Sequence, residues 1–172
     1  MIGPASAWTD STTPDVLQLV GFRVDHWRFA VRLAQVRTSV MPCAVTRVFH
    51  TPAFVLGIIS LHGTVVAVLD LGRLLGFQAS RAKHARFLVI SDAGMDAAIP
   101  VHEVFRLPAI PRELLETVPP HVAPENRSLL EGILNTSSLP EVASVSAQDT
   151  ITLIDAGTLF NAPVLRSLRG QG

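Results

Sequence analysis

The chain has 172 residues, of which 48% are apolar, enough to fill the core of one ordinary domain or of two small barrels. Fourteen basic residues balance fourteen acidic ones, so the sequence lacks the excess positive charge of a nucleic-acid-binding protein. Apolar runs such as AFVLGIIS and VVAVL are shorter than the roughly 20 residues of a membrane helix, and the first residues do not resemble a secretory signal. We therefore expect a cytoplasmic protein that binds neither DNA nor RNA and is not inserted into a membrane.

The apolar segments are short and rich in β-branched residues, and turn residues separate them about every ten positions, which is typical of small β-barrels. Residues 1–14 predict a disordered lead-in. The pattern predicts strands at 16–24, 27–33, 45–49, 57–61 and 64–69 in the first half, and at 86–91, 96–101, 104–107, 129–134 and 150–154 in the second. The polar, Pro-rich segments 108–128 and 135–148 predict loops, the first either without a helix or with a short one at 112–117.

The middle of the chain carries the clearest local signals. Thr51 followed by Pro52 predicts the start of a short helical turn, which Gly57 would close. His62 and Gly63 predict the tight reversal between two strands, because glycine adopts a positive φ without steric cost.

The same succession of two strands and a capped helix recurs near the C-terminus. Asp70 predicts the N-cap of a short helix that ends at Gly76, and the run ITLIDAGTLFNA places Asp155 and Asn161 at the equivalent positions. Other matching pairs are Phe22 with Ile90, Val31 with Ile99, Val36 with Val104, and Gly57 with Gly132. These matches indicate a duplicated unit, and chance similarity among apolar strands is the alternative.

The repeat predicts a single domain at 15–162, followed by a C-terminal tail at 163–172. Its halves would be a first barrel at about 20–84 and a second at about 85–160, with or without an exchange of strands between them. Strands such as GIISL and TVVAVL are apolar on both faces. Either contact between the barrels or a partner protein would explain this second apolar face.

Residues that serve catalysis or metal binding are not grouped in the sequence. The six histidines are isolated, at positions 26, 50, 62, 84, 102 and 121, and the motifs HExxH, CxxC, GxSxG and GxGxxG are absent. Asp70 and Asp155 are explained as helix caps, and the lone Cys43 predicts a buried, inert thiol. We therefore expect a protein that is not an enzyme and that needs no cofactor and no metal.

Three blocks occur in a specific order: FRVDHWRFAVRLAQV, then VTRVFHTPAFVLGIISLHGTVVAVLDLGRLLG, then RFLVI followed by AAIPVHEV. They resemble the opening hairpin, the NLRG reversal with its VPVIDL strand, and the VDxV element of the CheW-like adaptor domains of bacterial chemotaxis. The resemblance extends from about Val16 to Phe160. It implies a mainly β fold in which two SH3-like, five-stranded barrels pack together, with short helices.

The resemblance also implies a function, that of a non-enzymatic signalling scaffold that couples chemoreceptors, the methyl-accepting proteins, to a CheA-like histidine kinase. The receptor tip would dock in an apolar groove between the barrels, and the barrel ends would pair with kinase domains. The positions that match the family's receptor- or kinase-binding pattern are Val36, Thr38, Gly57, His62, Gly63, Ile99 and Val101.

Three positions depart from the family pattern. Thr38 replaces the usual Glu, His62 replaces the Arg of NLRG, and His102 replaces the Asp of VDxV. Histidine lacks the permanent, forked charge with which arginine binds a carboxylate. A second hypothesis therefore stays open: a diverged CheW-like structural or regulatory protein with another partner, for example in motility, pili or developmental signalling.

Overall fold

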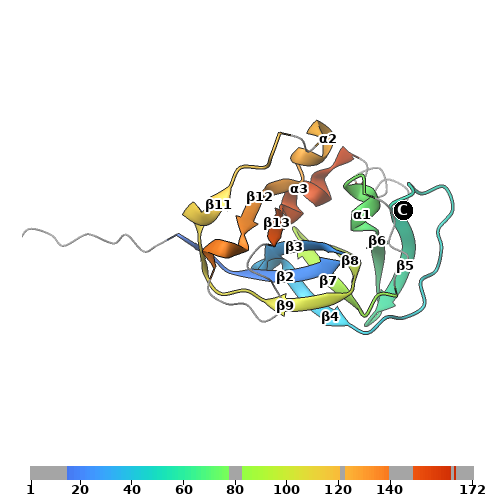
Figure 1. The fold of residues 1–172 in the computed structure, drawn as a ribbon. Helices are drawn as coiled ribbons and strands as arrows, with labels where there is room; N and C mark the ends of the chain where they lie inside the picture. Colours follow the sequence, from blue (N-terminus) through green and yellow to red (C-terminus); the bar gives the residue numbers. More distant parts are fainter. Residues whose placement is uncertain (1–14, 78–82, 121–122, 140–148, 164, 166–172) are drawn as a thin grey trace, which may run out of the picture.

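The computed structural model describes residues 15–77, 83–120, 123–139, 149–163 and 165 (Figure 1). The predicted lead-in at 1–14 and most of the tail at 163–172 lie outside these residues. The strands are β1 (Val16–Leu17), β2 (Leu19–Val24), β3 (Trp27–Arg32), β4 (Val36–Val40), β5 (Val55–Leu61), β6 (Thr64–Leu69), β7 (Arg86–Asp92), β8 (Met95–Val101), β9 (Glu103–Arg106), β10 (Ile110–Pro111), β11 (Leu115–Glu116), β12 (Leu130–Asn135) and β13 (Thr150–Ile154). The helices are α1 (Leu71–Leu74), α2 (Pro124–Arg127), α3 (Ala156–Asn161) and three 3-10 turns, η1 (Leu33–Gln35), η2 (Arg112–Leu114) and η3 (Thr136–Ser138).

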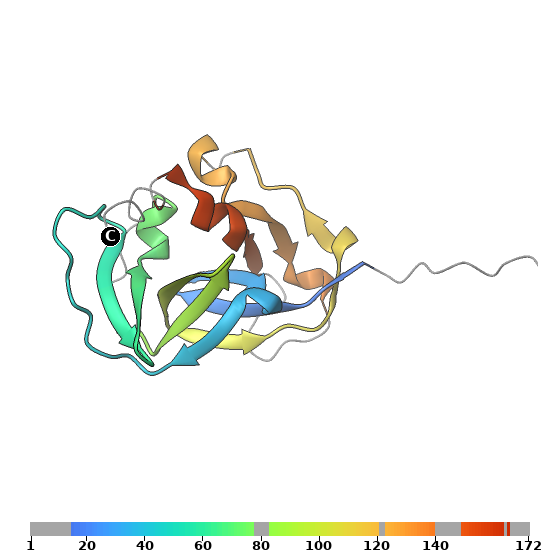
Figure 2. The same ribbon diagram turned by 180° about the vertical axis from the view of Figure 1, so that it is seen from behind.

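Two sheets make up most of the fold. The first sheet has the strand order β4-β7-β8-β6-β5, the second sheet has the order β11-β12-β13-β3-β2-β9, and β1 pairs with β10 beside them. Figures 1 and 2 show the three α-helices gathered on one side of the molecule. The chain is therefore mainly β with short helices, as predicted.

The two sheets exchange strands. The hairpin β2–β3, from the start of the chain, pairs with β9 and β13, whereas the hairpin β7–β8 pairs with β4 and β6. The expected barrel limits of about 20–84 and 85–160 therefore do not describe the sheets, because each sheet takes one hairpin from the other half of the chain. Strand exchange, which the sequence left open, is the arrangement that the pairing shows.

The strand registers reproduce the internal repeat. The parallel pair β6–β8 joins Ala67 to Ala97, and the parallel pair β13–β3 joins Thr152 to Phe29. The residue numbers differ by 85 between Ala67 and Thr152 and by 68 between Phe29 and Ala97. The sequence match of Asp70 with Asp155 also has an offset of 85, and that of Phe22 with Ile90 an offset of 68. The matched positions are therefore structurally equivalent, and the alternative of chance similarity is wrong.

A glycine marks a β-bulge at the same place in each copy. The register shifts at Gly57 in β5 and at Gly132 in β12. Gly57 has a φ of +147°, and a Cβ there would collide with the carbonyl oxygen of Thr46. The prediction that Gly57 closes a helical turn begun at Thr51 is therefore wrong, because β5 already begins at Val55 and the glycine serves a bulge under a neighbouring segment.

Both predicted helix caps are present. Asp70 Oδ1 accepts a hydrogen bond from the Arg73 N–H at 3.0 Å, which starts α1. Asp155 Oδ1 accepts one from the Thr158 N–H at 3.1 Å, and its Oδ2 accepts another from the Thr158 hydroxyl at 2.7 Å, which starts α3. Each carboxylate thus satisfies an amide that a helix start leaves without an internal partner.

Apolar side chains form three cores, one inside each sheet and one between the sheets. The core of the first sheet contains Ile59, Val66, Val68, Phe87, Val89 and Ala98. The core of the second contains Leu17, Leu19, Ala30, Phe105, Ile110, Leu134, Ile151 and Leu153. The intersheet core receives residues from both sheets and from α1 and α3, among them Phe22, Phe29, Leu69, Leu71, Ile90, Ile99 and Phe160. Strands β7 and β8 therefore bury both faces, whereas β6, one of the two strands predicted to be apolar on both faces, buries Leu69 between the sheets but leaves Val65 exposed.

The connection at 41–54 differs most from the sequence prediction. The expected strand at 45–49 does not form, and the pairing recorded in this segment is a single bridge between Thr46 and Ile58. Cys43 is exposed, so the prediction of a buried thiol is wrong. The reason is topological: β4 and β5 are opposite edges of the first sheet, so the connection must cross outside it, where few side chains reach a core.

Candidate functional site

An open hollow lies where the first sheet extends beyond α3, and we call it the sheet groove. It has a volume of about 430 Å³. Its lining comes from β5, β6, β8, α3 and the connection at 41–54, and consists of Val48, Thr51, Val55, Ile58, Val65, Ala67, Leu69, Met95, Asp96, Ala97, Phe160 and Leu165. Because α3 belongs to the second copy of the repeat, the groove lies between the two halves of the chain.

The alternation of side chains along β6 builds the floor of the sheet groove. Val65, Ala67 and Leu69 line it, whereas Val66 and Val68 point the other way into the core of the first sheet. Leu69 is buried in the intersheet core, but Val65 is 66% exposed. The sheet groove is therefore the open end of the intersheet core, where the second half of the chain does not cover the first sheet.

Two of the predicted contact residues lie on the strand face that lines the sheet groove at Ala97, but deeper in the fold. Ile99 and Val101 follow Ala97 on β8 with the same orientation, and their exposed fractions are 1% and 0%. Both pack in the intersheet core. They cannot contact a partner in this structure, because both sheets cover the face that the sequence pattern identified.

Two further predicted residues lie on the edge strand β4. Val36 is half-buried and packs against the intersheet core, and Thr38 is half-buried opposite Val89 on β7. Neither lines the sheet groove. Arg37, between them, forms an ion pair with Asp96, which does line it, so the edge strand is linked to the groove through this pair.

The remaining three predicted residues belong to β5 and the turn that follows it. Gly57 is buried beneath Thr46 and has no free surface to offer. His62 and Gly63 form the exposed reversal between β5 and β6, with φ values of +48° and +81°, which confirms the predicted turn. The predicted site thus divides into a buried core, an edge strand and an exposed turn.

Sequence reasoning missed most of the residues that line the sheet groove. Val65 had a signal, since it is an outward-facing apolar residue in the strand TVVAVL. Phe160 had none, because its place in the groove depends on where α3 packs. Phe49, in the connection beside the groove, is 84% exposed, which is unusual for a large aromatic side chain.

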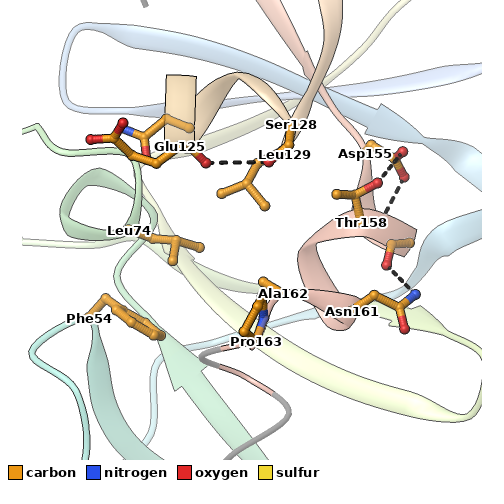
Figure 3. Close-up of a pocket in the computed structure, with 12 residues that line it drawn as sticks. Phe54, Leu74, Glu125, Ser128, Leu129, Asp155, Thr158, Asn161, Ala162 and Pro163 are labelled. Carbon is orange, nitrogen blue, oxygen red and sulfur yellow. Dashed lines mark hydrogen bonds between the residues drawn. The ribbon is translucent and has the colours of Figure 1, made fainter. Parts of the chain in front are cut away.

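A second hollow, the helix groove, lies among α1, α2 and α3 and has a volume of about 680 Å³. Its lining is Phe54, Leu74, Glu125, Asn126, Ser128, Leu129, Asp155, Gly157, Thr158, Asn161, Ala162 and Pro163. Figure 3 shows Phe54 and Leu74 across from Ala162 and Pro163. Asp155 accepts hydrogen bonds from the Thr158 N–H and hydroxyl, and this capping role explains why a carboxylate stands in the groove.

The described parts of the chain contain no group of three His, Cys, Asp or Glu residues arranged to hold a metal ion. Within the same residue ranges, no helix has the length and apolar character needed to cross a bilayer. What the described surface offers instead is two apolar grooves and an exposed turn, which are features of a module that binds other proteins.

Two sheets that exchange strands, with an apolar groove between the two halves of the chain, define a class of β-rich binding modules. The CheW-like domain family model matches residues 18–163, and the chain belongs to this family. It is 28% identical over 120 residues to the chemotaxis protein CheW of Helicobacter pylori, covering 69% of this chain and 72% of the relative. It is 25% identical over 118 residues to the probable chemotaxis protein CheW of Rhizobium etli, covering 68% and 76%.

A solved structure supports the fold. The crystal structure of the scaffolding protein TtCheW from Thermoanaerobacter tengcongensis superimposes with a TM-score of 0.69, over 87% of this chain and 95% of that protein. Only 23% of residues are identical, so the likeness concerns the fold. It confirms the predicted class of two SH3-like β units packed together, although hydrogen bonds do not close either sheet into a continuous barrel among the described strands.

Proposed function

We propose that this protein is a non-enzymatic signalling scaffold that works in the cytoplasm and couples chemoreceptors to a CheA-like histidine kinase. The observation that carries the proposal is the CheW-like match over residues 18–163, which spans both copies of the repeat. The names of the relatives point the same way, since two are chemotaxis proteins and the similar structure is that of a scaffolding protein.

The sheet groove is the proposed docking place of the receptor tip. Its lining is mostly apolar, it lies between the two halves, and Val65 and Phe160 come from different copies of the repeat. An apolar groove of this kind suits the apolar face of a helix, which gains affinity by burying that face. The Arg37–Asp96 ion pair at the edge would add polar recognition.

The outer edge of the first sheet, formed by β5 and the connection that bridges to it at Thr46, is the proposed contact with the kinase. The turn at His62 and Gly63 projects from one end of this edge, and Phe49 exposes a large apolar surface toward its other end. Exposed aromatic side chains that contribute little to a core are common at protein interfaces. Each contact would be modest alone, and assembly of many scaffolds would raise the avidity.

Binding measurements with purified cognate partners test this proposal. Val65→Glu places a charge in the sheet groove, and we expect it to weaken binding of the receptor tip at least about tenfold while the kinase still binds. Phe49→Ser should weaken binding of the kinase while the receptor tip still binds. Leu33→Glu is the matched control, because Leu33 is an exposed apolar residue that lies outside both surfaces. If the unsubstituted protein bound neither partner, the coupling function would be wrong.

The alternative function is that of a diverged CheW-like protein with a different partner. His62 favours it, because this histidine stands in an exposed turn where the family pattern has arginine. His102 does not, since its ring has a structural role described below. The alternative predicts a folded protein that fails to bind the chemotaxis partners, and it predicts that His62→Arg restores kinase binding. Normal binding by the unsubstituted protein would exclude it.

A further inference from the structure

The chain passes from the first sheet to the second at His102, which lies between β8 and β9. Its backbone N–H donates to the Arg23 carbonyl at 2.8 Å, and its ring Nδ1 accepts a hydrogen bond from the Asp25 N–H at 2.9 Å. The side chain is only 8% exposed. One residue therefore holds the β2–β3 hairpin to the crossover through two hydrogen bonds.

A second histidine lies against this one. The ring centroids of His84 and His102 are 5.0 Å apart. Burial and the nearby His102 lower the pKa of His84, and the carboxylates of Asp70 and Asp25 oppose this effect without cancelling it.

The other charged groups around the two histidines are largely committed to each other. Asp70 lies 3.4 Å from the Arg73 guanidinium, and Glu103 lies 3.4 Å from that of Arg23. Asp25 Oδ1 is 3.7 Å from His102 Nε2. The remaining titratable or charged side chains on the adjoining segments are His26 on the hairpin turn, and Lys83 and Arg86 on either side of His84. Two of the three carboxylates near the pair are thus already neutralised by arginine.

We propose that His84 and His102 form an acid-sensitive joint between the two sheets, which loosens when His84 takes up a proton. A charged His84 would lose hydration in its half-buried place against the His102 ring, whose Nδ1 already accepts the Asp25 N–H. Through His102 this cost acts on the β2–β3 hairpin, where the Trp27 ring stacks on Phe77 with centroids 4.4 Å apart. The joint belongs to the fold and does not depend on which partner the scaffold binds.

The direction of the pH effect follows from the lowered pKa of His84. In the native state this histidine binds a proton less readily than in the unfolded chain, whose pKa is about 6.5. The stability contributed by a neutral His84 is therefore present above about pH 6.5 and is lost as the pH falls below it. Between pH 7.5 and pH 5.5, one such histidine raises the unfolding equilibrium constant by up to about tenfold.

The test compares urea unfolding at pH 7.5 and pH 5.5 in a Trp8→Phe background, so that fluorescence reports Trp27 alone. We expect the unfolding constant of the background protein to rise more than that of His84→Gln, by up to about tenfold. His62→Gln, in the exposed β5–β6 turn, is the matched control and should behave like the background. As the pH is lowered until the native His84 takes up its proton in an NMR titration, the Trp27 emission of the native protein should also shift, and His84→Gln should abolish the shift.

Two results would overturn the joint. One is an equal pH dependence in the background protein and in His84→Gln. The other is an NMR titration in which the His84 ring of the background protein takes up its proton at or above pH 6.5. The NMR titration needs no substitution in the joint, so it decides the question even if His84→Gln fails to fold.

Discussion

The two copies of the repeat form equivalent strands but differ in what lies outside them. In the second copy, β11 pairs with the bulged strand β12, so that Glu116 lies opposite Ile133. In the first copy, the equivalent strand β5 meets the crossing segment at one bridge, between Thr46 and Ile58, and the rest of the connection leaves Phe49 exposed. The duplication thus preserves the sheets, whereas the connecting segments have diverged.

The same contrast appears in each sheet on the strand that pairs with the bulged one. Val65 on β6 is exposed, and its equivalent 85 residues later on β13 is the exposed Thr150. An exposed position needs no apolar side chain for folding, and the second copy shows that a polar one is accepted there. The fold therefore does not require the apolar residue in the first copy, and this supports the proposed receptor site on that half.

The largest loss of stability should come from shortening a side chain in the intersheet core, to which both copies of the repeat contribute. Ile99→Ala should destabilise the protein by about 2–5 kcal/mol, because it leaves a cavity at a fully buried position. Val31→Ala, at the equivalent position of the first copy, should cost less since fewer methylene groups are removed. Urea unfolding measures both. If Ile99→Ala kept full stability and weakened receptor binding, Ile99 would be a contact residue after all.

The sequence was a good guide to elements with local causes. The cap at Asp70, the turn at His62 and Gly63, and the strand at 64–69 depend on neighbours in the chain, and all three are present. The 3-10 turn η2 begins at Arg112 as the predicted helix does, but β11 follows it at Leu115 because that segment pairs with β12. Local pattern could not reveal this distant partner.

The candidate site was less accessible from sequence, because burial depends on the other half of the chain. Alternation along β8 places Ile99 and Val101 on the same face as Ala97, but only the packing of the second sheet shows that they are covered. Conversely, Phe160 enters the sheet groove from a helix that the sequence predicts only by analogy with the first copy. In both cases the deciding contacts come from the other half of the chain, which a local pattern does not contain.

Substituting the two bulge glycines, Gly57 and Gly132, is the next test of how the two copies differ. Gly57→Ala should cost about 2–3 kcal/mol, because it combines a positive φ with a collision against the Thr46 backbone. Gly132→Ala should cost about 1–2 kcal/mol, since its Cβ would lie 2.6 Å from a Leu115 side-chain atom that can move, although the Glu116 carbonyl oxygen is also close at 2.7 Å. Denaturant unfolding gives both values, and a larger cost at Gly132 would contradict this ranking.

Removing the two helix caps should give a smaller difference in stability between the copies. Asp155→Ala should cost about 1–2 kcal/mol and Asp70→Ala about 1 kcal/mol, because Asp155 accepts two hydrogen bonds from Thr158. Asp70 accepts one from Arg73 and adds a half-exposed ion pair with it, which contributes little. Thermal unfolding of the two variants measures the difference. Asp→Asn at each position is the control, since asparagine retains an acceptor and should preserve most of the stability.

The smallest expected effect concerns the two equivalent hairpin turns. Asp25 and Ala93 stand 68 residues apart and both adopt a positive φ, of +53° and +49°. Alanine is strained in this conformation, whereas aspartate and asparagine accept it more readily. Ala93→Asn should therefore stabilise the protein by about 0.5 kcal/mol, measured as a higher urea midpoint with an unchanged slope. Ala109→Asn, at an exposed position without a positive φ, is the control and should be neutral. An equal gain in stability from Ala93→Asn and Ala109→Asn would mean that the added polar group, and not relief of backbone strain at residue 93, stabilises the protein.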